Sequence, residues 1–277
     1  MPTTAEKRRE FRRLHESSCF VIPNPWDVGS TRYLQGLGFK ALATTSAGFA
    51  FTRALPDGAV TRDDMLAHIA ELSAAADVPF NADFEGGYAD APEGVAESVR
   101  LCCGTGVSGL SIEDSTGDAS KPLYDFDLAL ARVKAARAAV DKAGGDVVFT
   151  ARTEGFVRGR PDLDESIRRL KAYAEAGADC LYAPGITTRE QIAAVIKAVA
   201  PKPVNVLIGW ASDLSVSDLA ALGARRISVG GALARTAWSG FTRAAKMIAE
   251  EGSFKGIATT PSNGELNKIF SEDMKKR

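Results

Sequence analysis

The stretch VPFNADFEGGY (residues 78–88) joins a short apolar run to an abruptly polar end. An amide and two acids, Asn81, Asp83 and Glu85, follow the apolar residues, and two glycines come next. Two later apolar runs end in a similar way: GLSIED closes on two acids, and VVFTAR closes on an arginine. Three charged strand ends predict that these groups converge on one place in the fold.

Outward from this stretch, the chain alternates short apolar runs with longer helical patterns. The segments between the runs carry apolar residues at a 3.6-residue period, with Thr61 suited to an N-cap and Gly177 to a helix end. Strands joined by helices must run parallel, and such strands are buried on both faces. The predicted strands are CFVIP (19–23), ALATT (41–45), PFNAD (79–83), GLSIED (109–114), VVFTAR (147–152), CLYAP (180–184), VNVLIG (204–209) and RISVGG (226–231).

Eight such units in 277 residues predict an α/β protein with a (β/α)8 TIM barrel. The alternative is an open doubly wound sheet, which usually carries a glycine-rich phosphate turn after its first strand. The turn in that place, PNPWDVGS, has no G-x-G-x-x-G pattern. Because no low-complexity linker interrupts the chain, we expect one barrel domain over residues 1–277, with residues 260–277 as a C-terminal helical tail.

Composition indicates a protein without a nucleic-acid footprint. The chain has 34 basic and 35 acidic residues, a formal net charge of −1, and 45% hydrophobic residues. Its one basic cluster, EKRREFRR near the N-terminus, is expected to be the solvated face of a helix. We expect neither a signal peptide nor a membrane span, and the four cysteines match no zinc or redox motif. The expected location is the cytoplasm.

The polar strand ends indicate a site, because active sites of such barrels form at the C-terminal ends of the strands. Asn81, Asp83, Glu113 and Arg152 are expected to share one opening. Clustered carboxylates suit Mg²⁺, and an arginine can pair with a substrate carboxylate. The alternative is that these acids cap helices or pair with basic residues, and for Asp114 and Glu154 the two interpretations are equally favoured.

The second strand leads into TTSAG, where Ser46-Ala47-Gly48 form a turn of small residues. Backbone N–H groups in such a turn are free to meet an anion. Asp57 lies further on, in PDGAVT, just before the next helical pattern. PDG is also good turn chemistry, so Asp57 alone favours a structural interpretation.

Taken together, PNPWD, TTSAG, PDGAVTRDD, NADFEGGY, GLSIED, ARTE and PVNVLIG resemble, in order and spacing, the isocitrate lyase/phosphoenolpyruvate mutase superfamily. The resemblance covers most of the chain. It implies a barrel whose last helix is exchanged between subunits of a dimer or tetramer. It also implies Mg²⁺ or Mn²⁺ and a small 2-oxo acid or related carboxylate, with a C–C or P–C bond cleaved or formed through an enolate-like species.

The resemblance also assigns individual residues. Ser46, Ala47 and Gly48 stand where the family holds the carboxylate and carbonyl oxygens of the substrate. The other matches are the loop aspartate (Asp57), the D-x-D metal motif (Asn81 and Asp83), the acid of IED (Glu113), the arginine of AR (Arg152) and a polar residue at the seventh strand end (Asn205).

Two departures from the family pattern change the expected site. The D-x-D motif is NAD here, so Asn81 brings no charge to the metal, and Glu85 is the residue placed to compensate. The family's lyases carry a K-x-C-G-H segment after IED, whose cysteine is the general acid. This chain has SIEDSTGDASKPLYD there, without cysteine or histidine, and Lys121-Pro122 is only a faint match to the polar loop of the mutases.

The favoured function is therefore an Mg²⁺-dependent lyase acting on a small 2-oxo or hydroxy carboxylate. Asp83, Asn81, Glu85 and Glu113 would hold the metal. Asp57, Glu113, Arg152 and Lys121 are the candidate catalytic groups, and Asn205 joins Arg152 and Ser46–Gly48 in binding the substrate. The alternatives are phosphonopyruvate mutase or hydrolase chemistry, a non-catalytic 2-oxo acid binding protein and, as a weaker fit, ketopantoate hydroxymethyl transfer. An apolar edge on the tail, with Leu266, Ile269 and Phe270, predicts a homo-oligomer.

Overall fold

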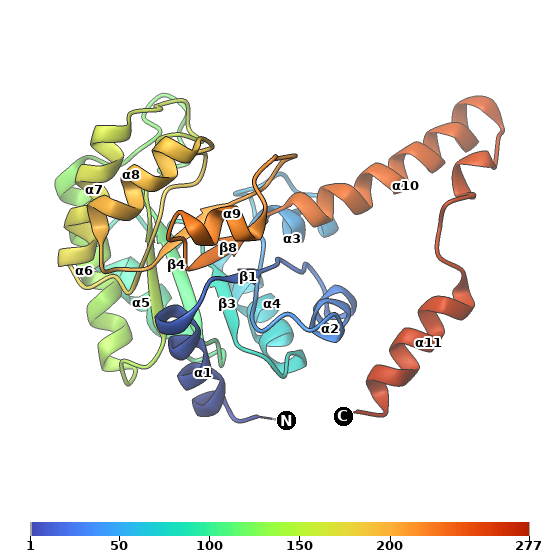
Figure 1. Cartoon of the computed structure of the whole chain (residues 1–277), viewed down its shortest axis with the longest axis horizontal. Coiled ribbons are helices and arrows are strands. Elements are labelled where there is room, and N and C mark those ends of the chain that lie inside the picture. Colours follow the sequence, from blue (N-terminus) through green and yellow to red (C-terminus); the bar gives the residue numbers. More distant parts are fainter. Residues whose placement is uncertain (1, 277) are drawn as a thin grey trace.

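Eight short parallel strands form the centre of the molecule (Figure 1). The structure is a computed structural model that describes residues 2–276. All eight predicted strands are found in their places, so the predicted TIM barrel is confirmed. The strands are β1 (Phe20–Ile22), β2 (Leu42–Ala43), β3 (Phe80–Asp83), β4 (Gly109–Glu113), β5 (Val148–Arg152), β6 (Cys180–Tyr182), β7 (Val204–Leu207) and β8 (Arg226–Ser228).

The barrel is nearly closed, because each strand from β2 to β7 pairs with the next and β1 pairs with β8. At the seam between β1 and β2, the N–H of Ala43 donates to the carbonyl of Pro23 at 3.1 Å. The interior is unusually polar: Asn81, Thr150, Asn205 and Arg226 are all buried. The apolar core lies instead between the strands and the surrounding helices, as expected for a parallel sheet buried on both faces.

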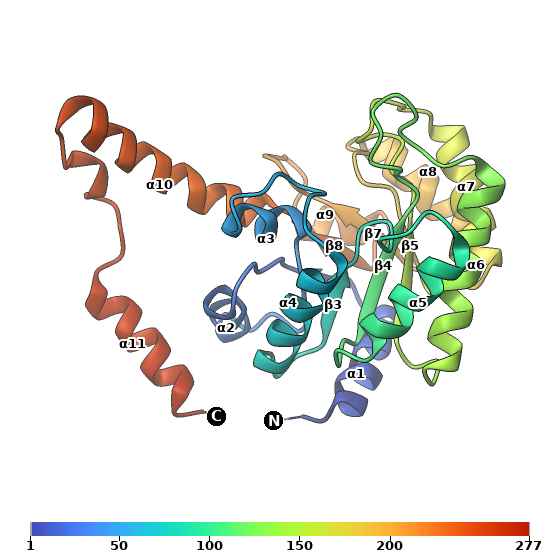
Figure 2. The same ribbon diagram turned by 180° about the vertical axis from the view of Figure 1, so that it is seen from behind.

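Helices follow the strands and surround the barrel in both views (Figures 1 and 2). Local signals in the sequence set their ends. The hydroxyl of Thr61 accepts the N–H of Asp64 at the start of α4, and Gly177 takes a positive φ of 97° just past α7. The helices are α2 (Val28–Gly36), α3 (Ser46–Thr52), α4 (Arg62–Ala75), α5 (Pro92–Cys103), α6 (Phe126–Lys142), α7 (Leu163–Glu175), α8 (Arg189–Val199) and α9 (Val216–Ala221).

An N-terminal helix, α1 (Thr4–Ser17), closes the end of the barrel opposite the predicted site. Its basic residues were expected to be solvated, and for two of them this was wrong. Lys7 donates to the carbonyls of Ser73 and Ala76, both at 3.0 Å, and Arg8 donates to the carbonyl of Cys103 at 2.8 Å. The last carbonyls of a helix have no partner within it, so α1 supplies donors to the ends of α4 and α5.

The chain ends in an arm that leaves the barrel. Helix α10 (Ala232–Glu251) projects outward, and after a 3₁₀ turn (Lys255–Ile257) helix α11 (Asn263–Met274) runs back beside α2 (Figure 2). Asp273 of α11 pairs with buried Arg32 of α2 at 2.6 Å. The predicted tail helix is thus present, and its exchange with a neighbouring subunit stays a prediction.

The four cysteines are free, and Cys102 and Cys103 are buried on α5. Among the helices of the described region, none has the length and apolar character needed to cross a membrane.

Candidate active site

A cavity of about 660 Å³ opens at the C-terminal ends of the strands, within the size range of small-molecule sites. It is strongly polar, since five carboxylate side chains and two guanidinium groups line it in the described part of the chain. Three of the predicted site residues line it: Glu85 from the loop after β3, Glu113 from the end of β4 and Arg152 from the end of β5. The charged groups along its wall are Asp57, Glu85, Asp90, Glu113, Glu154, Arg152 and Arg158.

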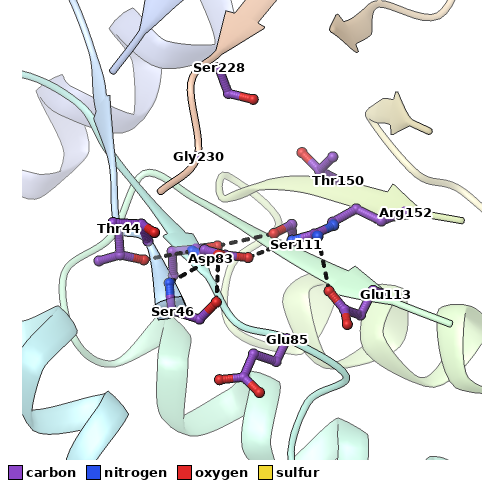
Figure 3. A network of polar contacts seen from close by, with 12 residues as sticks. Thr44, Ser46, Asp83, Glu85, Ser111, Glu113, Thr150, Arg152, Ser228 and Gly230 are labelled. Atoms are coloured by element: carbon purple, nitrogen blue, oxygen red, sulfur yellow. Dashed lines mark hydrogen bonds and ion pairs between the residues drawn. The ribbon is translucent and has the colours of Figure 1, made fainter. Parts of the chain in front are cut away.

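Arg152 is the centre of the site (Figure 3). Its guanidinium contacts Asp83 at 2.5 Å, Glu113 at 3.0 Å and Glu154 at 2.9 Å. Its guanidinium carbon also lies 4.9 Å from the ring centroid of Tyr182. Register explains the convergence, because Glu113 and Arg152 are paired neighbours on β4 and β5. A fixed, planar cation at the floor of a cavity is well suited to a bidentate contact with a carboxylate.

Asp83 joins Arg152 to the start of α3. Its second oxygen accepts the backbone N–H of Ser46 at 3.2 Å and the Ser46 hydroxyl at 3.1 Å (Figure 3). The Asp83 N–H in turn donates to the Thr44 hydroxyl at 2.8 Å. The predicted small-residue turn is therefore the first turn of a helix, and Ser46 is its cavity-lining member.

Ala47 and Gly48 follow Ser46 in that turn and are not part of the cavity wall. Gly48 is buried, its N–H donates to the Thr45 hydroxyl at 3.2 Å, and an added Cβ would lie 2.5 Å from a Thr45 methyl carbon. Only glycine fits this position, so its role in the fold is steric. The structure brings Ser46 to the cavity and keeps Gly48 as the support beneath it.

Glu113 and Glu154 are buried acids on the same guanidinium. Burial raises the pKa of Glu113 well above its usual range, and the charge of Glu154 adds to this effect. The pKa of Glu154 is raised too, first by burial. Arg158 lies 3.5 Å from the other Glu113 oxygen. The two acids therefore resist being ionised together unless a further cation is present.

Glu85 faces the cavity from a strained backbone. Its φ is +47°, in the left-handed region that residues other than glycine rarely adopt, and Tyr88 in the same loop has a φ of +58°. The Tyr88 hydroxyl donates to Glu85 at 3.0 Å. Burial, and after it the charge of Asp83, raises the pKa of Glu85 to about 7. The loop thus holds a carboxyl that titrates near neutral pH.

Asp57 lies on the loop after α3, at the rim of the cavity. Its side chain remains largely exposed, yet its pKa is raised, first by partial loss of water and then by Asp83. A structural turn alone does not require this placement. The structure brings Asp57 to the same opening as Glu113 and Arg152.

Asp114 has a structural role. It accepts the N–H of Glu154 and the hydroxyl of Tyr173, both at 2.8 Å, and pairs with Arg169 at 3.1 Å. These contacts account for a buried carboxylate without any ligand. Of the two acids for which both interpretations were open, Asp114 belongs to the fold, whereas Glu154 lines the cavity.

The remaining predicted residues lie outside this cavity. Asn81 and Asp83 were expected at the opening, but they line a smaller space of about 30 Å³, which Arg152 also borders. Asn205 is buried one layer deeper in the barrel, where it accepts from Arg226 and donates to Ser228, each at 2.9 Å. Lys121 is exposed and pairs with Asp125 at 2.8 Å. It lies on a hairpin at residues 115–124, closed by an antiparallel bridge between Ser115 and Leu123, and it lines a separate space of about 340 Å³. The structure therefore does not bring Lys121 to the acids.

The donor set fits a hard divalent cation in its chemistry. Five carboxylates face two guanidinium groups, and four of the acids, Asp57, Glu85, Glu113 and Glu154, have raised pKa values, in each case first because of burial and then because of a neighbouring acid. The side-chain oxygen of Asn81 is buried without a partner, an unusual state for an amide. No three acidic, histidine or cysteine side chains in residues 2–276 are already arranged as a metal cluster. Arg152 instead bridges Asp83 and Glu113.

Several cavity residues were given no role by the sequence. Asp90 and Arg158 match no motif, and Tyr88 and Tyr124 lie in segments, NADFEGGY and SIEDSTGDASKPLYD, that assign these tyrosines no function. The glycine pair before Tyr88 indicates a turn, but it does not say where the tyrosine points. Only the folded loops place these side chains.

A model of the family described as phosphoenolpyruvate phosphomutase matches residues 11–249. That is most of the chain. The protein belongs to the phosphoenolpyruvate phosphomutase family. The predicted membership of the isocitrate lyase/phosphoenolpyruvate mutase superfamily is thereby confirmed, as is the prediction of an enzyme rather than a binding protein.

Three relatives show the range of this family. A Burkholderia cenocepacia J2315 protein described as a lyase/mutase has a crystal structure with a TM-score of 0.92 and 48% identity, over 96% of each chain. Oxaloacetate acetylhydrolase in complex with its product oxalate gives a TM-score of 0.86 and 27% identity, over 99% of this chain and 97% of that one. Oxaloacetate decarboxylase of Paraburkholderia xenovorans is 30% identical over 82% of this chain and 75% of its own.

Proposed function

We propose that this phosphoenolpyruvate phosphomutase family member is a metal-dependent carbon–carbon lyase acting on a small 2-oxo or hydroxy carboxylate. The observation that carries the proposal is Arg152, a buried cation at the cavity floor that touches Asp83 and Glu113. Relatives named for oxaloacetate chemistry support the substrate class. We further infer that the enzyme works in the cytoplasm as a homodimer or homotetramer.

Asp83 and Glu85 are the residues we assign to Mg²⁺ or Mn²⁺, with Glu113 and Asn81 as further oxygen donors. When bound, such an ion neutralises negative charge that develops on substrate oxygens. Arg152 then exchanges one of its carboxylate partners for the carboxylate of the substrate, since both bind the same planar fork. Ser46 orients that carboxylate from the first turn of α3, with Ala47 and Gly48 behind it and Asn205 supporting from below.

Cleavage of a C–C bond requires a proton for the carbon that leaves, and the cavity must supply it. Asp57 and Glu113 are the two carboxyls we assign to proton transfer, because both line the cavity and the pKa of each is raised. When Glu113 carries the proton, Asp83, Glu85 and Asn81 are the oxygen donors that remain for the metal. Lys121 was the third candidate. It can act only if the hairpin that carries it moves toward the cavity.

The decisive experiment is an NMR assay of the purified protein with Mg²⁺ against oxaloacetate, 2-methylisocitrate, isocitrate, 2,3-dimethylmalate and phosphonopyruvate. We expect C–C cleavage of one carboxylate and its loss in Arg152→Met. Lys121→Met is the matched test of the third candidate, and near-normal turnover there removes Lys121 from the mechanism. No consumption of any compound, with or without Mn²⁺, would overturn the proposal.

The second candidate function is P–C bond chemistry on phosphonopyruvate, favoured by the description of the family model itself. The same assay separates the two functions. Conversion of phosphonopyruvate, followed by ³¹P NMR, with the other compounds unchanged, would select the mutase or hydrolase reaction.

A further inference from the structure

Two loops that line the cavity are anchored on one buried side chain, Arg132 of α6. Arg132 is only 1% exposed and lies outside the cavity wall. Its guanidinium donates to the carbonyl oxygens of Gly86, Ala89 and Asp90, the last at 2.8 Å. These residues belong to the loop that directly follows Glu85. One side chain thus ties down the backbone of the loop that positions this acid.

The second loop reaches the same guanidinium through Tyr124. The Tyr124 ring centroid lies 4.0 Å from the guanidinium carbon of Arg132, and the Tyr124 hydroxyl donates to Asp90. Tyr124 ends the hairpin that begins with the bridge from Ser115 to Leu123. The hairpin supplies Ser115 and Tyr124 to the cavity wall. Arg132 therefore contacts both segments that form this side of the cavity, the loop after Glu85 and the hairpin.

The energetics make this contact cooperative. The guanidinium of Arg132 donates to carbonyl oxygens, and the carboxylates of Asp90 and Asp114 act on its charge without a direct hydrogen bond. A buried cation of this kind is tolerated only when its acceptors are all in place. The close approach also depends on Gly86, where an added Cβ would lie 3.3 Å from an Arg132 nitrogen. Displacing one loop therefore weakens the hold on the other.

We propose that Arg132 is a positioning residue that couples the order of the loop at residues 84–90 to that of the hairpin at residues 115–124. The coupling sets the shape of the cavity around Glu85, so its effect on catalysis rests on the proposed function. The coupling itself belongs to the fold and can be measured without any substrate.

The test is amide hydrogen exchange, measured by mass spectrometry on the full chain. Arg132→Lys keeps the charge but loses the planar fork and the stacking. We expect exchange in both loops to rise together, by about tenfold or more, with the strands unchanged. Arg137→Lys is the matched control: it lies on the same helix, and Arg137 pairs with Asp179 at 3.0 Å, away from both loops. The control should exchange like the wild type.

Two further variants separate coupling from general loosening. Tyr124→Leu removes the ring from the hairpin side, so exchange must also rise in the loop at residues 84–90. Tyr124→Phe keeps the ring and should recover most of that protection. A rise confined to the hairpin in Tyr124→Leu, or in one loop only in Arg132→Lys, would overturn the proposal. If Arg132→Lys does not fold, the tyrosine pair decides.

Binding provides a readout tied to the site. With Mg²⁺ and oxalate as the probe, calorimetry should show affinity about tenfold weaker in Arg132→Lys than in Arg137→Lys. Equal oxalate affinity in the two variants would contradict the effect of Arg132 on the cavity and leave it with a role in folding alone. Failure of the wild type to bind oxalate or turn over any carboxylate counts against the proposed function, whereas the exchange result still decides the coupling.

Discussion

At the scale of single residues, the site holds more carboxylates than cations. Arg152 is shared by Asp83, Glu113 and Glu154 within 3.0 Å, and Glu85 has a cavity-facing carboxyl held by Tyr88. Such crowding raises pKa values and leaves room for a cation or a proton. Replacements that change one charge should therefore show directly in metal affinity and in pH dependence.

Asn81→Asp tests whether the strand end at β3 holds the metal. The change adds a unit charge near the divalent ion, so Mg²⁺ should bind more tightly by about 1 kcal/mol or more at an effective dielectric near 20. Asp83→Ala should weaken Mg²⁺ binding. Titration calorimetry measures both, with Asp125→Asn, an exposed acid paired with Lys121, as the control. Unchanged affinity in both variants would show that the metal binds elsewhere.

Glu85→Gln tests the raised pKa of Glu85, about 7 against a usual 4.5. Between these values the folded state binds more protons than the unfolded state, so this carboxyl makes stability fall as pH rises. The variant should thus gain stability over the wild type from pH 4.5 to pH 8, by at most about 3 kcal/mol. Denaturant unfolding at several pH values measures it. Glu16→Gln, on the exposed side of α1, is the control, and parallel curves for Glu85→Gln and wild type would refute the assignment.

At the scale of elements, α1 shows how a helix can act as a cap for others. Its apolar face was readable from the sequence, and Phe11 is fully buried. Its basic face looked like ordinary solvated surface. The carbonyls that Lys7 and Arg8 satisfy belong to helices 60 to 100 residues away, so only the tertiary arrangement reveals the need for these donors.

Lys7→Met measures that capping. The variant keeps the apolar stem but leaves the carbonyls of Ser73 and Ala76 without this donor, which should cost about 1–3 kcal/mol of unfolding free energy. Arg13→Met is the matched control, because Arg13 is exposed on the same helix and its guanidinium pairs with nearby Glu10. Chemical denaturation should show a change within about 0.5 kcal/mol for the control. Equal losses in the two variants would contradict the capping role.

At the scale of the whole molecule, the C-terminal arm carries large apolar side chains that remain exposed in a single chain. Trp238 and Phe241 of α10 are 41% and 62% exposed, and Phe270 of α11 is 38% exposed. Large apolar side chains gathered on a projecting arm mark an interaction surface. A second copy of the chain is the partner we expect, in keeping with the predicted homo-oligomer.

Phe241→Asp should break that assembly. Light scattering coupled to size-exclusion chromatography should give a dimer or tetramer for the wild type at micromolar concentration. The variant should shift toward the monomer, because a charge buried in an apolar interface is costly. Val216→Asp, an equally apolar exposed position on α9, should leave the mass unchanged. A monomeric wild type would contradict the prediction.

The amino-acid sequence by itself determined the barrel and several of the charged residues at its opening. The spacing of apolar residues and the polar residues that end each apolar run are local properties of the sequence. The eight strands and the acids at the ends of β3 and β4 could therefore be predicted. The layer at which a side chain lies, and its partners, depend on register and on contacts between distant segments. For this reason the structure alone placed Asn205 deep on Arg226, kept Lys121 away from the acids, and joined two loops on Arg132.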